Sequence, residues 1–237
     1  MAGENSKVTF SYDQHKDAWS WVLIAKDRCC WGMDWEPQVA HIPSDLLVEI
    51  QKNSETKAIE LVENHLKNNR YQPFKQKIIE SEIEALKISW QFVEKKYFEI
   101  LESITNKSIY QKEFPALITT GFMCPYSTDD SPSWFMISIW RSIPDSITTI
   151  AHEIFHLQYL HYWGIEVEKK LGKEKSEDLK EALTFLLDED EFDKIILCED
   201  GGYPDHLELR KKLSKFWQSK KNFQELVDFG VDLLQKN

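Results

Sequence analysis

Five consecutive residues combine two histidines and a glutamate at a spacing that can bind a metal ion. They are His152-Glu153-Ile154-Phe155-His156, an HExxH motif. Side chains four residues apart lie on the same face of a helix, so both imidazoles can direct a nitrogen at one zinc ion. Glu153 lies about 100° further round the helix, where its carboxylate can act as a general base. The motif therefore predicts metal-assisted hydrolysis, with one Zn²⁺ per chain as the cofactor.

A catalytic zinc site needs a third protein ligand, because such sites take three side chains and leave one position for water. His161 is about 140° from His156 around the helix, so it can bind only if the helix has already ended. Glu181 is the better candidate, because it lies at the edge of the apolar stripe of a later helix and can face inward. Glu177, one turn earlier on the same face, is its strongest rival. The expected ligands are His152, His156 and Glu181.

The segment around the motif is predicted to form a buried helix. Pro144 suits a first helical turn, and Asp145 is favourable near the positive end of a helix. From Asp145 to Trp163 the chain is apolar nearly all round, which is typical of a helix inside a protein, and Gly164 is a natural stop. Histidine and glutamate are costly to bury without partners, so this setting favours a bound metal ion over a chance match.

The segments on either side of this helix supply a small sheet and further helices. Residues 114–125 and 134–140 are rich in Ile, Thr, Phe and Trp, and a cluster of turn residues at 127–132 separates these two predicted strands. After the motif, helices are expected over residues 176–187, 206–218 and 221–235.

The first hundred residues are predicted to be helical. Helices are expected over 13–26 and 44–53, and from 54 or 55 to 69. Between Gln76 and Thr105, apolar residues alternate spacings of four and three with charges between them: Ile79, Ile83, Leu86, Trp90, Val93, Tyr97, Ile100 and Ile104. Such a seam is compatible with a coiled-coil dimer, but we favour a single long helix packed on one side against its own domain.

Together these elements predict an α+β protein that is mostly helical, with a small β-sheet whose edge strand precedes the HExxH helix. A change in composition divides a helical N-terminal region, 1–107, from a catalytic region, 108–237. No Gly-rich or Ser-rich linker marks the change, so the two regions can also form one continuous domain.

The composition limits the partners and the location. With 237 residues, 42% of them hydrophobic, the chain can bury a core. Its four cysteines, at 29, 30, 124 and 198, include no CxxC pair, and the N-terminus has no apolar signal region, so we expect a soluble cytoplasmic protein. The net charge of −11 argues against nucleic acid and anionic membrane, which bind basic faces. The expected partner is a peptide or protein substrate, and the oligomeric state stays open.

At the HExxH motif the chain resembles the zincin metallopeptidases, in particular their gluzincin branch. In that family an edge strand precedes the HExxH helix, and a second helix supplies a glutamate that a small residue often follows. Here these segments are 134–140, 145–163 and 176–187 with Glu181-Ala182, so the resemblance covers about residues 110–190. Glu181-Ala-Leu-Thr-Phe185 also resembles a helix of the small intracellular peptidases that cut phage-type repressors, although the helix-turn-helix of those proteins is missing. Residues 1–107 resemble no family that we recognise.

The resemblance implies a zinc-dependent metallopeptidase. Zinc lowers the pKa of its bound water towards about 7, and Glu153 accepts the proton and later passes it to the leaving amine. An extended substrate can pair with the exposed edge of strand 134–140. Gluzincins usually add a tyrosine or histidine that stabilises the oxyanion, and the candidates here are Tyr159, Tyr162, Tyr203 and His206.

A second interpretation is a zinc-binding but non-hydrolytic interaction module. A structural zinc site is closed by four ligands, and His161 or Glu177 can supply the fourth. Glu153 favours catalysis, because a structural site has no need of a base there. A third interpretation keeps the peptidase but makes it latent, with the N-terminal helices or the acidic segment 188–191 covering the cleft.

Overall fold

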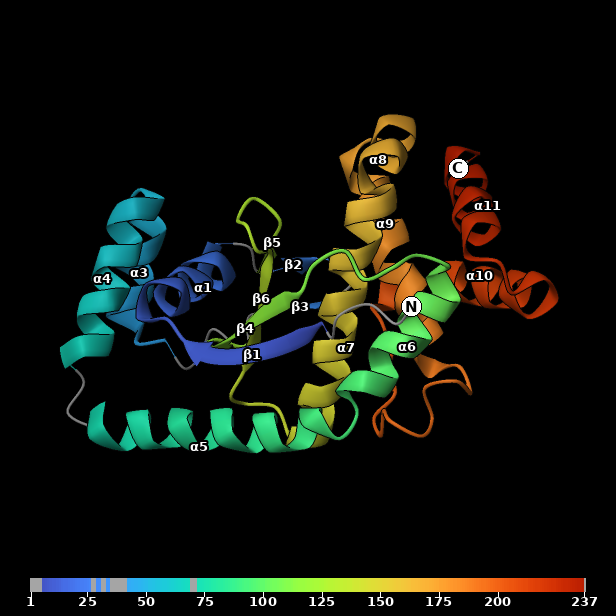
Figure 1. The fold of residues 1–237 in the computed structure, drawn as a ribbon. Coiled ribbons are helices and arrows are strands. Elements are labelled where there is room, and N and C mark those ends of the chain that lie inside the picture. The colour runs from blue at the N-terminus through green and yellow to red at the C-terminus, as the bar shows by residue number, and fades with distance from the viewer. Residues whose placement is uncertain (1–5, 27–28, 31–32, 35–41, 69–71, 237) are drawn as a thin grey trace.

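The computed structural model describes residues 6–26, 29–30, 33–34, 42–68 and 72–236 (Figure 1). Within these residues the protein is mostly helical around a four-stranded sheet, so the expected α+β class is confirmed. The strands of this sheet, in spatial order, are β1 (Lys7–Tyr12), β4 (Glu113–Thr119), β6 (Trp134–Ser138) and β5 (Tyr126–Ser127). The first three are parallel and β5 is antiparallel to β6. A separate antiparallel pair consists of β2 (Cys29–Cys30) and β3 (Met33–Asp34).

Two of these strands correct the sequence analysis. Strand β1 lies in the region that was expected to be helical, and it pairs with β4 about a hundred residues later. Strand β6 was expected at the edge of the sheet, but β5 pairs along its first residues, Tyr126 with Phe135 and Ser127 with Trp134. The two errors have different causes. Strand β1 is paired by a segment about a hundred residues away, which its own residues cannot show, whereas β5 has only two residues and is too short to show a pattern.

The N-terminal helices pack together at one end of the sheet. They are α1 (Gln14–Lys26), α3 (Ser44–Lys52) and α4 (Glu55–Asn68), close to the positions expected from the sequence. They bury an apolar cluster of their own, in which Ala18, Ile24, Ile50, Ala58 and Val62 are inaccessible to solvent or nearly so. Figure 1 shows this group at one end of the sheet, where α1 packs against β4.

A buried carboxylate ties α1 to the end of β4. Asp17 is fully buried, and its carboxylate accepts hydrogen bonds from the Thr120 amide at 2.7 Å, the Thr119 hydroxyl at 2.9 Å and the Tyr12 hydroxyl at 2.8 Å. The ammonium of Lys75 lies 3.6 Å away. A buried carboxylate needs this number of partners, since an unpaired charge in the interior is strongly destabilising.

The predicted long helix between Gln76 and Thr105 is wrong in one respect, because it consists of two helices. They are α5 (Gln72–Gln91) and α6 (Glu94–Thr105), and the chain turns between them. The Glu94 carboxylate accepts hydrogen bonds from the Trp90 indole at 3.0 Å and from the Val8 amide in β1 at 2.7 Å. The bond to Val8 ties the start of α6 to β1, at the point where the helix breaks although the apolar spacing continues. The expected apolar face stays buried or half-buried along both halves.

Side chains of the strands alternate between two apolar layers, as the pleat of a sheet requires. One face meets α5, α6 and α7 (Ile143–Tyr159) in the main core through Phe114, Ala116, Ile118, Phe135 and Ile137. The other face meets Trp19 of α1 through Leu117, Trp134 and Met136. The sheet is therefore covered on both sides, and α7 is held against it.

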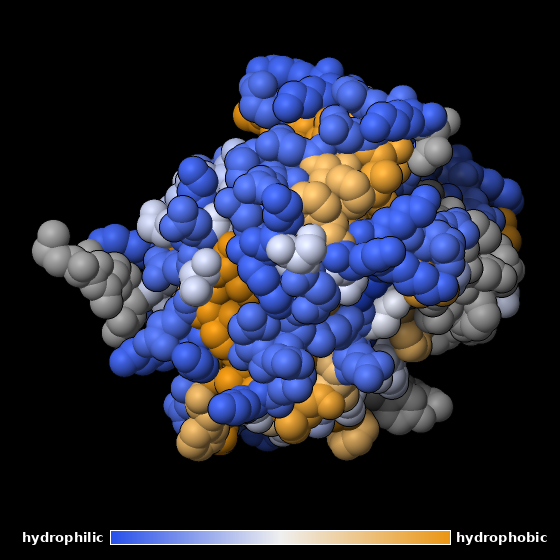
Figure 2. Space-filling view, turned by 90° about the vertical axis from the view of Figure 1, so that its right-hand side faces the viewer, coloured by the Kyte–Doolittle hydropathy of each residue, from blue (hydrophilic) through white to orange (hydrophobic). Residues whose placement is uncertain are grey.

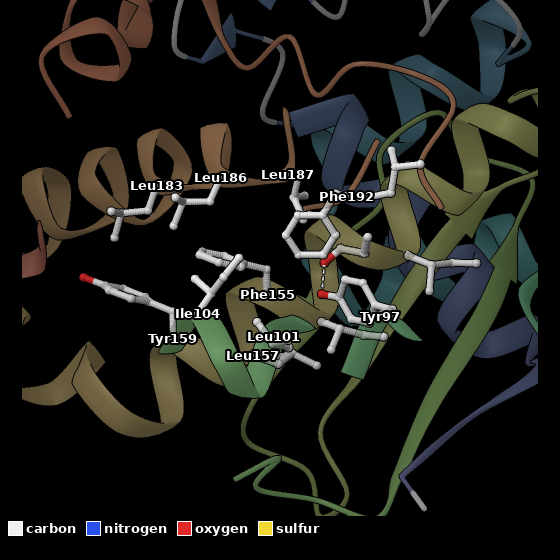
Figure 3. Close-up of a cluster of buried hydrophobic side chains, with 14 of the residues drawn as sticks. Tyr97, Leu101, Ile104, Phe155, Leu157, Tyr159, Leu183, Leu186, Leu187 and Phe192 are labelled. Carbon is white, nitrogen blue, oxygen red and sulfur yellow. Dashed lines mark hydrogen bonds between the residues drawn. The ribbon is translucent and has the colours of Figure 1, made fainter. Parts of the chain in front are cut away.

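The main core joins the two halves of the sequence. Tyr97 of α6 is fully buried, and its hydroxyl donates a hydrogen bond of 2.6 Å to the Ala151 carbonyl of α7, drawn as a dashed line in Figure 3. Around this bond pack residues from before and after residue 107, among them Leu101, Ile104, Phe155, Leu157, Leu186 and Phe192. The backbone of the HExxH helix is thus fixed by the N-terminal region.

The predicted stop at Gly164 is also wrong. The chain continues from α7 through a π-helical turn, Leu160–Gly164, into α8 (Ile165–Leu171). The helix ends at Gly172, whose positive φ of 77° glycine adopts readily, and whose amide bonds to the Glu168 carbonyl at 2.8 Å. Gly164 instead lies against Leu160, where an added methyl group would approach that side chain to 3.1 Å.

The remaining helices return over the core. They are α9 (Lys173–Leu183) with a following 3₁₀ turn (Thr184–Asp188), a second 3₁₀ turn (Pro204–His206), α10 (Leu207–Lys220) and α11 (Phe223–Gln235). The face that carries the C-terminal helices is mostly hydrophilic, with hydrophobic side chains visible in strips between the elements (Figure 2). Among the described residues, no helix is both long and apolar enough to cross a membrane.

Candidate metal centre and active site

Helices α7 and α9 bring together the two histidines and one of the candidate glutamates. His156 Nε2 lies 3.2 Å from Glu181 Oε2, and His152 Nε2 lies 3.4 Å from the same oxygen. One potential ligand atom from each residue lies within 4.8 Å of the others. This set of two imidazole nitrogens and one carboxylate oxygen matches the protein ligands that catalytic zinc sites use.

The group is buried by the elements that supply it. His156 is 1% exposed and Glu181 is 5% exposed, because α7 is covered by the sheet and α9 returns across it. The Nδ1 atom of His156 has no hydrogen-bond partner among the described residues. Burial lowers the pKa of His156 to about 3, so its ring is neutral and can offer a nitrogen to a metal ion.

His152 is oriented by a carboxylate on its other side. Its Nδ1 lies 3.2 Å from Asp200 Oδ2 while its Nε2 faces Glu181. Burial disfavours the charged ring, but the negative charges of Asp200 and Glu181 outweigh burial and hold the pKa of His152 well above its usual value. Carboxylates in this position fix the orientation of a metal-binding histidine and make its ligating nitrogen more basic.

Asp200 is itself anchored by the C-terminal part of the chain. Burial opposes its ionisation, but the charges of His152 and Arg210 lower the pKa of Asp200 to about 2. The Arg210 guanidinium donates to the Asp200 carbonyl and to Asp188 Oδ2, the latter at 2.9 Å. Gly202 has a φ of 64°, and any side chain there would collide with Arg210, so this loop requires glycine.

Glu153 lies beside the group with its carboxylate available. The side chain is 6% exposed, and its Oε2 atom has no hydrogen-bond partner among the described residues. Burial raises the pKa of Glu153 to about 7, with the charge of Glu181 acting in the same direction and that of His152 opposing it. A carboxylate with a pKa near neutrality is suited to accepting and returning a proton.

A buried lysine lies on the outer side of Glu181. The Lys180 ammonium donates hydrogen bonds to Glu177 Oε2 at 2.6 Å and to the Tyr126 hydroxyl at 2.6 Å, and lies 3.1 Å from Glu181 Oε1. Burial disfavours both charges, yet the neighbouring opposite charges outweigh it. They hold the pKa of Glu181 well below its usual range and that of Lys180 well above.

A cavity of about 440 Å³ opens onto these residues. One wall is the face of α7 from Asp145 to His156, and α9 contributes the residues from Glu177 to Glu181. The opposite walls are apolar and come from α1, from the segment before β6 and from the loop after Asp200: Trp19, Leu23, Met123, Tyr126 and Tyr203. The cavity therefore combines a charged wall with apolar walls, as small-molecule and peptide sites usually do.

The structure separates the four candidate oxyanion stabilisers. Tyr203 lines the cavity, whereas Tyr159 and His206 do not. The Tyr159 hydroxyl is buried, and the Tyr159 ring stacks against Trp163. His206 Nε2 lies 3.1 Å from Asp178 Oδ1. The Tyr162 hydroxyl bonds to the Ser108 carbonyl at 2.9 Å, away from the cavity.

The two alternative ligands are both occupied elsewhere. Glu177 is held by Lys180 at the rim of the cavity, 31% exposed at its side chain. His161 lies in the π-helical turn, where its ring stacks on Tyr110 at a centroid distance of 4.4 Å. The structure thus brings Glu181, and neither alternative, to the two histidines.

Three residues that face the site were missed in the sequence analysis: Tyr126, Lys180 and Asp200. Tyr126 belongs to a two-residue strand that no periodicity can reveal. Lys180 follows the helical pattern of a solvated charge, and only its neighbour Glu181 was singled out. Asp200 immediately precedes Gly201-Gly202, a loop signal that shows no metal-binding spacing.

Comparisons with known proteins identify no relative, since no family model, no curated protein and no solved structure matches this chain. A functional assignment therefore rests on the geometry and chemistry of the site.

Proposed function

We propose that this protein is a zinc-dependent metallopeptidase with a zincin-like arrangement of its site. The observation that carries the proposal is the convergence of His152, His156 and Glu181 within 4.8 Å on the wall of a cavity, with the Glu153 carboxylate beside them. Glu153 Oε2 is buried and has no hydrogen-bond partner within the described part of the chain, which fits a carboxylate that meets water or substrate in the cavity.

The chain's own residues then have distinct roles. His152, His156 and Glu181 would hold the ion. When bound, zinc supplies Lewis acidity, which polarises a carbonyl and lowers the pKa of water. Glu153 accepts a proton from the attacking water and returns it to the leaving amine, for which its pKa of about 7 is suited.

The cavity favours a peptide as the substrate. Its apolar walls at Trp19, Leu23 and Met123 can bury a side chain, while the charged wall of α7 faces the scissile bond. Pairing of the substrate with β6 is restricted to the part of that strand beyond Met136, because β5 pairs with Trp134 and Phe135 and the Met136 amide bonds to the Pro125 carbonyl.

We also propose that the protein acts in the cytosol. Two described cysteines, Cys124 and Cys198, are free, and the side chains at 29 and 30 lie outside the described part.

Metal analysis of four proteins tests the proposal. We expect one zinc per chain in the wild type and in Glu153→Gln, and loss of zinc in His156→Ala and Glu181→Ala. Wild type should cleave members of a peptide library, and Glu153→Gln should be slower by about 10²- to 10⁴-fold.

Two other results would change the conclusion. A wild type that takes up no zinc even after reconstitution would remove the peptidase function. Zinc uptake without any peptide hydrolysis would favour the alternative, a zinc-binding but non-hydrolytic module, or a latent enzyme whose cleft is covered.

A further inference from the structure

Lys180 carries its charge in the interior, directly behind the proposed metal ligand. It is 1% exposed, whereas Lys173 at the start of the same helix is exposed. Lysine is almost never fully buried unless it is paired, because removing an ammonium from water is costly. Its position therefore needs an explanation beyond the packing of α9.

Three oxygens surround this ammonium. It donates hydrogen bonds to Glu177 Oε2 at 2.6 Å and to the Tyr126 hydroxyl at 2.6 Å, and it forms an ion pair with Glu181 Oε1 at 3.1 Å. A lysine ammonium can donate but not accept, so all three oxygens meet it as acceptors or as negative charge. The side chain is held from three directions by α9 itself and by β5.

This arrangement divides the two oxygens of Glu181 between two tasks. Oε1 faces Lys180 at 3.1 Å, while Oε2 faces His156 Nε2 at 3.2 Å and His152 Nε2 at 3.4 Å. A free carboxylate could offer both oxygens to a metal ion. Because Lys180 occupies Oε1, only Oε2 is free to bind a metal ion between the two imidazoles.

The same ammonium restrains the rival carboxylate. Glu177 lies one turn before Glu181 and lines the same cavity, yet its Oε2 is bound to Lys180 at 2.6 Å. A second carboxylate on the ion would tend to close a site that needs an open position for water.

We propose that Lys180 is a positioning residue, which limits Glu181 to one metal-binding oxygen and keeps Glu177 away from the ion. This inference rests on the proposed metal site, but it concerns coordination and can fail independently of it.

The hydrogen bond between Lys180 and Tyr126 has a further consequence. Because an ammonium can only donate, the Tyr126 oxygen accepts, and the Tyr126 hydroxyl hydrogen is left to donate elsewhere, from a ring that lines the cavity.

Cobalt substitution tests the inference without relying on peptide hydrolysis. Co²⁺ replaces Zn²⁺ in such sites, and four-coordinate Co²⁺ absorbs visible light much more strongly than five- or six-coordinate Co²⁺. We would record the visible spectrum per bound Co²⁺ for the wild type, Lys180→Met, Glu177→Gln and Lys180→Met/Glu177→Gln. Lys173→Met is the matched control, because it removes an exposed lysine from the same helix.

The expected spectrum of wild type is that of four-coordinate Co²⁺, unchanged in Lys173→Met and in Glu177→Gln. Lys180→Met should lose most of this intensity, because the released carboxylate oxygens raise the coordination number. The double variant should recover part of it, because the second carboxylate is gone. A Lys180→Met protein with the wild-type spectrum would overturn the inference and leave the metal site intact. A wild type that binds no Co²⁺ would remove both the site and the inference.

A measurement on the wild type decides the matter if Lys180→Met does not fold. In protein labelled with ¹⁵N-lysine, a buried and hydrogen-bonded ammonium exchanges its hydrogens slowly and gives its own NH₃⁺ resonance. We expect one such resonance, strongly displaced when paramagnetic Co²⁺ is bound. If no slowly exchanging lysine resonance appears, or if Co²⁺ leaves it in place, Lys180 does not hold Glu181 at the ion.

Discussion

His152 Nδ1 lies 3.2 Å from Asp200 Oδ2, although the two residues are 48 positions apart in the chain. This contact turns the opposite nitrogen of the ring towards Glu181 and His156. Asp200 is held in turn by Arg210 of α10, so the C-terminal helices determine how the first histidine of the motif is oriented.

Replacing Asp200 should therefore weaken metal binding without abolishing it. Asp200→Asn keeps the shape of the side chain but removes the charge that makes the ligating nitrogen more basic. We expect zinc affinity to fall by about 10- to 100-fold, measured by competition with a chromophoric chelator. Asp190→Asn is the control, because Asp190 is exposed on the neighbouring acidic segment. Equal affinities in the two variants would show that Asp200 does not support the ligand.

Metal binding should also release protons at neutral pH. The pKa of His152 is held well above its usual value, so both ring nitrogens carry a proton in the metal-free protein. One nitrogen must lose its proton before it can bind zinc. His156 is already neutral, with a pKa of about 3. Zinc affinity should thus rise by about tenfold per pH unit while His152 remains protonated.

A pH-indicator dye in weakly buffered solution measures this release directly. At least one proton per zinc should appear at pH 7, and Asp200→Asn should release fewer because the pKa of His152 falls when its partner loses its charge. Binding without proton release would mean that His152 is neutral before the metal arrives.

Among the tyrosines, Tyr126 should matter most for hydrolysis. Burial raises its pKa to about 12, so the hydroxyl stays protonated and can donate a hydrogen bond to developing negative charge. Tyr126→Phe should lower kcat by about 10²- to 10³-fold with zinc content unchanged. Tyr159→Phe should have little effect, because Tyr159 does not line the cavity. If Tyr203→Phe shows the larger loss, the stabilising hydroxyl is that of Tyr203.

Asp17 does not line the cavity, so a substitution there tests the stability of the fold separately from metal binding. Asp17→Asn removes a fully buried charge from the Thr119, Thr120 and Lys75 contacts, and we expect a loss of about 3–5 kcal/mol in the free energy of unfolding. Asp13→Asn is the comparison. Asp13 accepts from the amides of His15 and Lys16 at the exposed start of α1, a role worth about 1 kcal/mol that asparagine largely retains. Urea unfolding measures both, and similar midpoints for the two variants would contradict the role of Asp17.

Local patterns in the sequence were sufficient for most helices and for the core of the site. An apolar helix that carries HExxH can only be buried, and α7 is buried along nearly its whole length. A four-residue spacing on a helix places two side chains on one face whatever surrounds it, so the pairing of His152 with His156 follows from helix geometry. The mostly helical α+β class follows from periodicity in the same way.

Contacts between distant segments decided the rest. Glu177 and Glu181 lie on one face of α9, and only the packing of α9 across α7 brings Glu181 to the histidines while Lys180 holds Glu177. Strand β1 joins the sheet through β4, Glu94 at the break between α5 and α6 bonds to β1, and Asp200, next to a glycine loop, meets His152. The sequence by itself determined which residues can bind a metal and which helix carries them, because those properties depend on neighbours within one turn. Which carboxylate completes the site, and which groups orient it, only the tertiary structure decided, because those contacts are made between elements that the local pattern cannot relate.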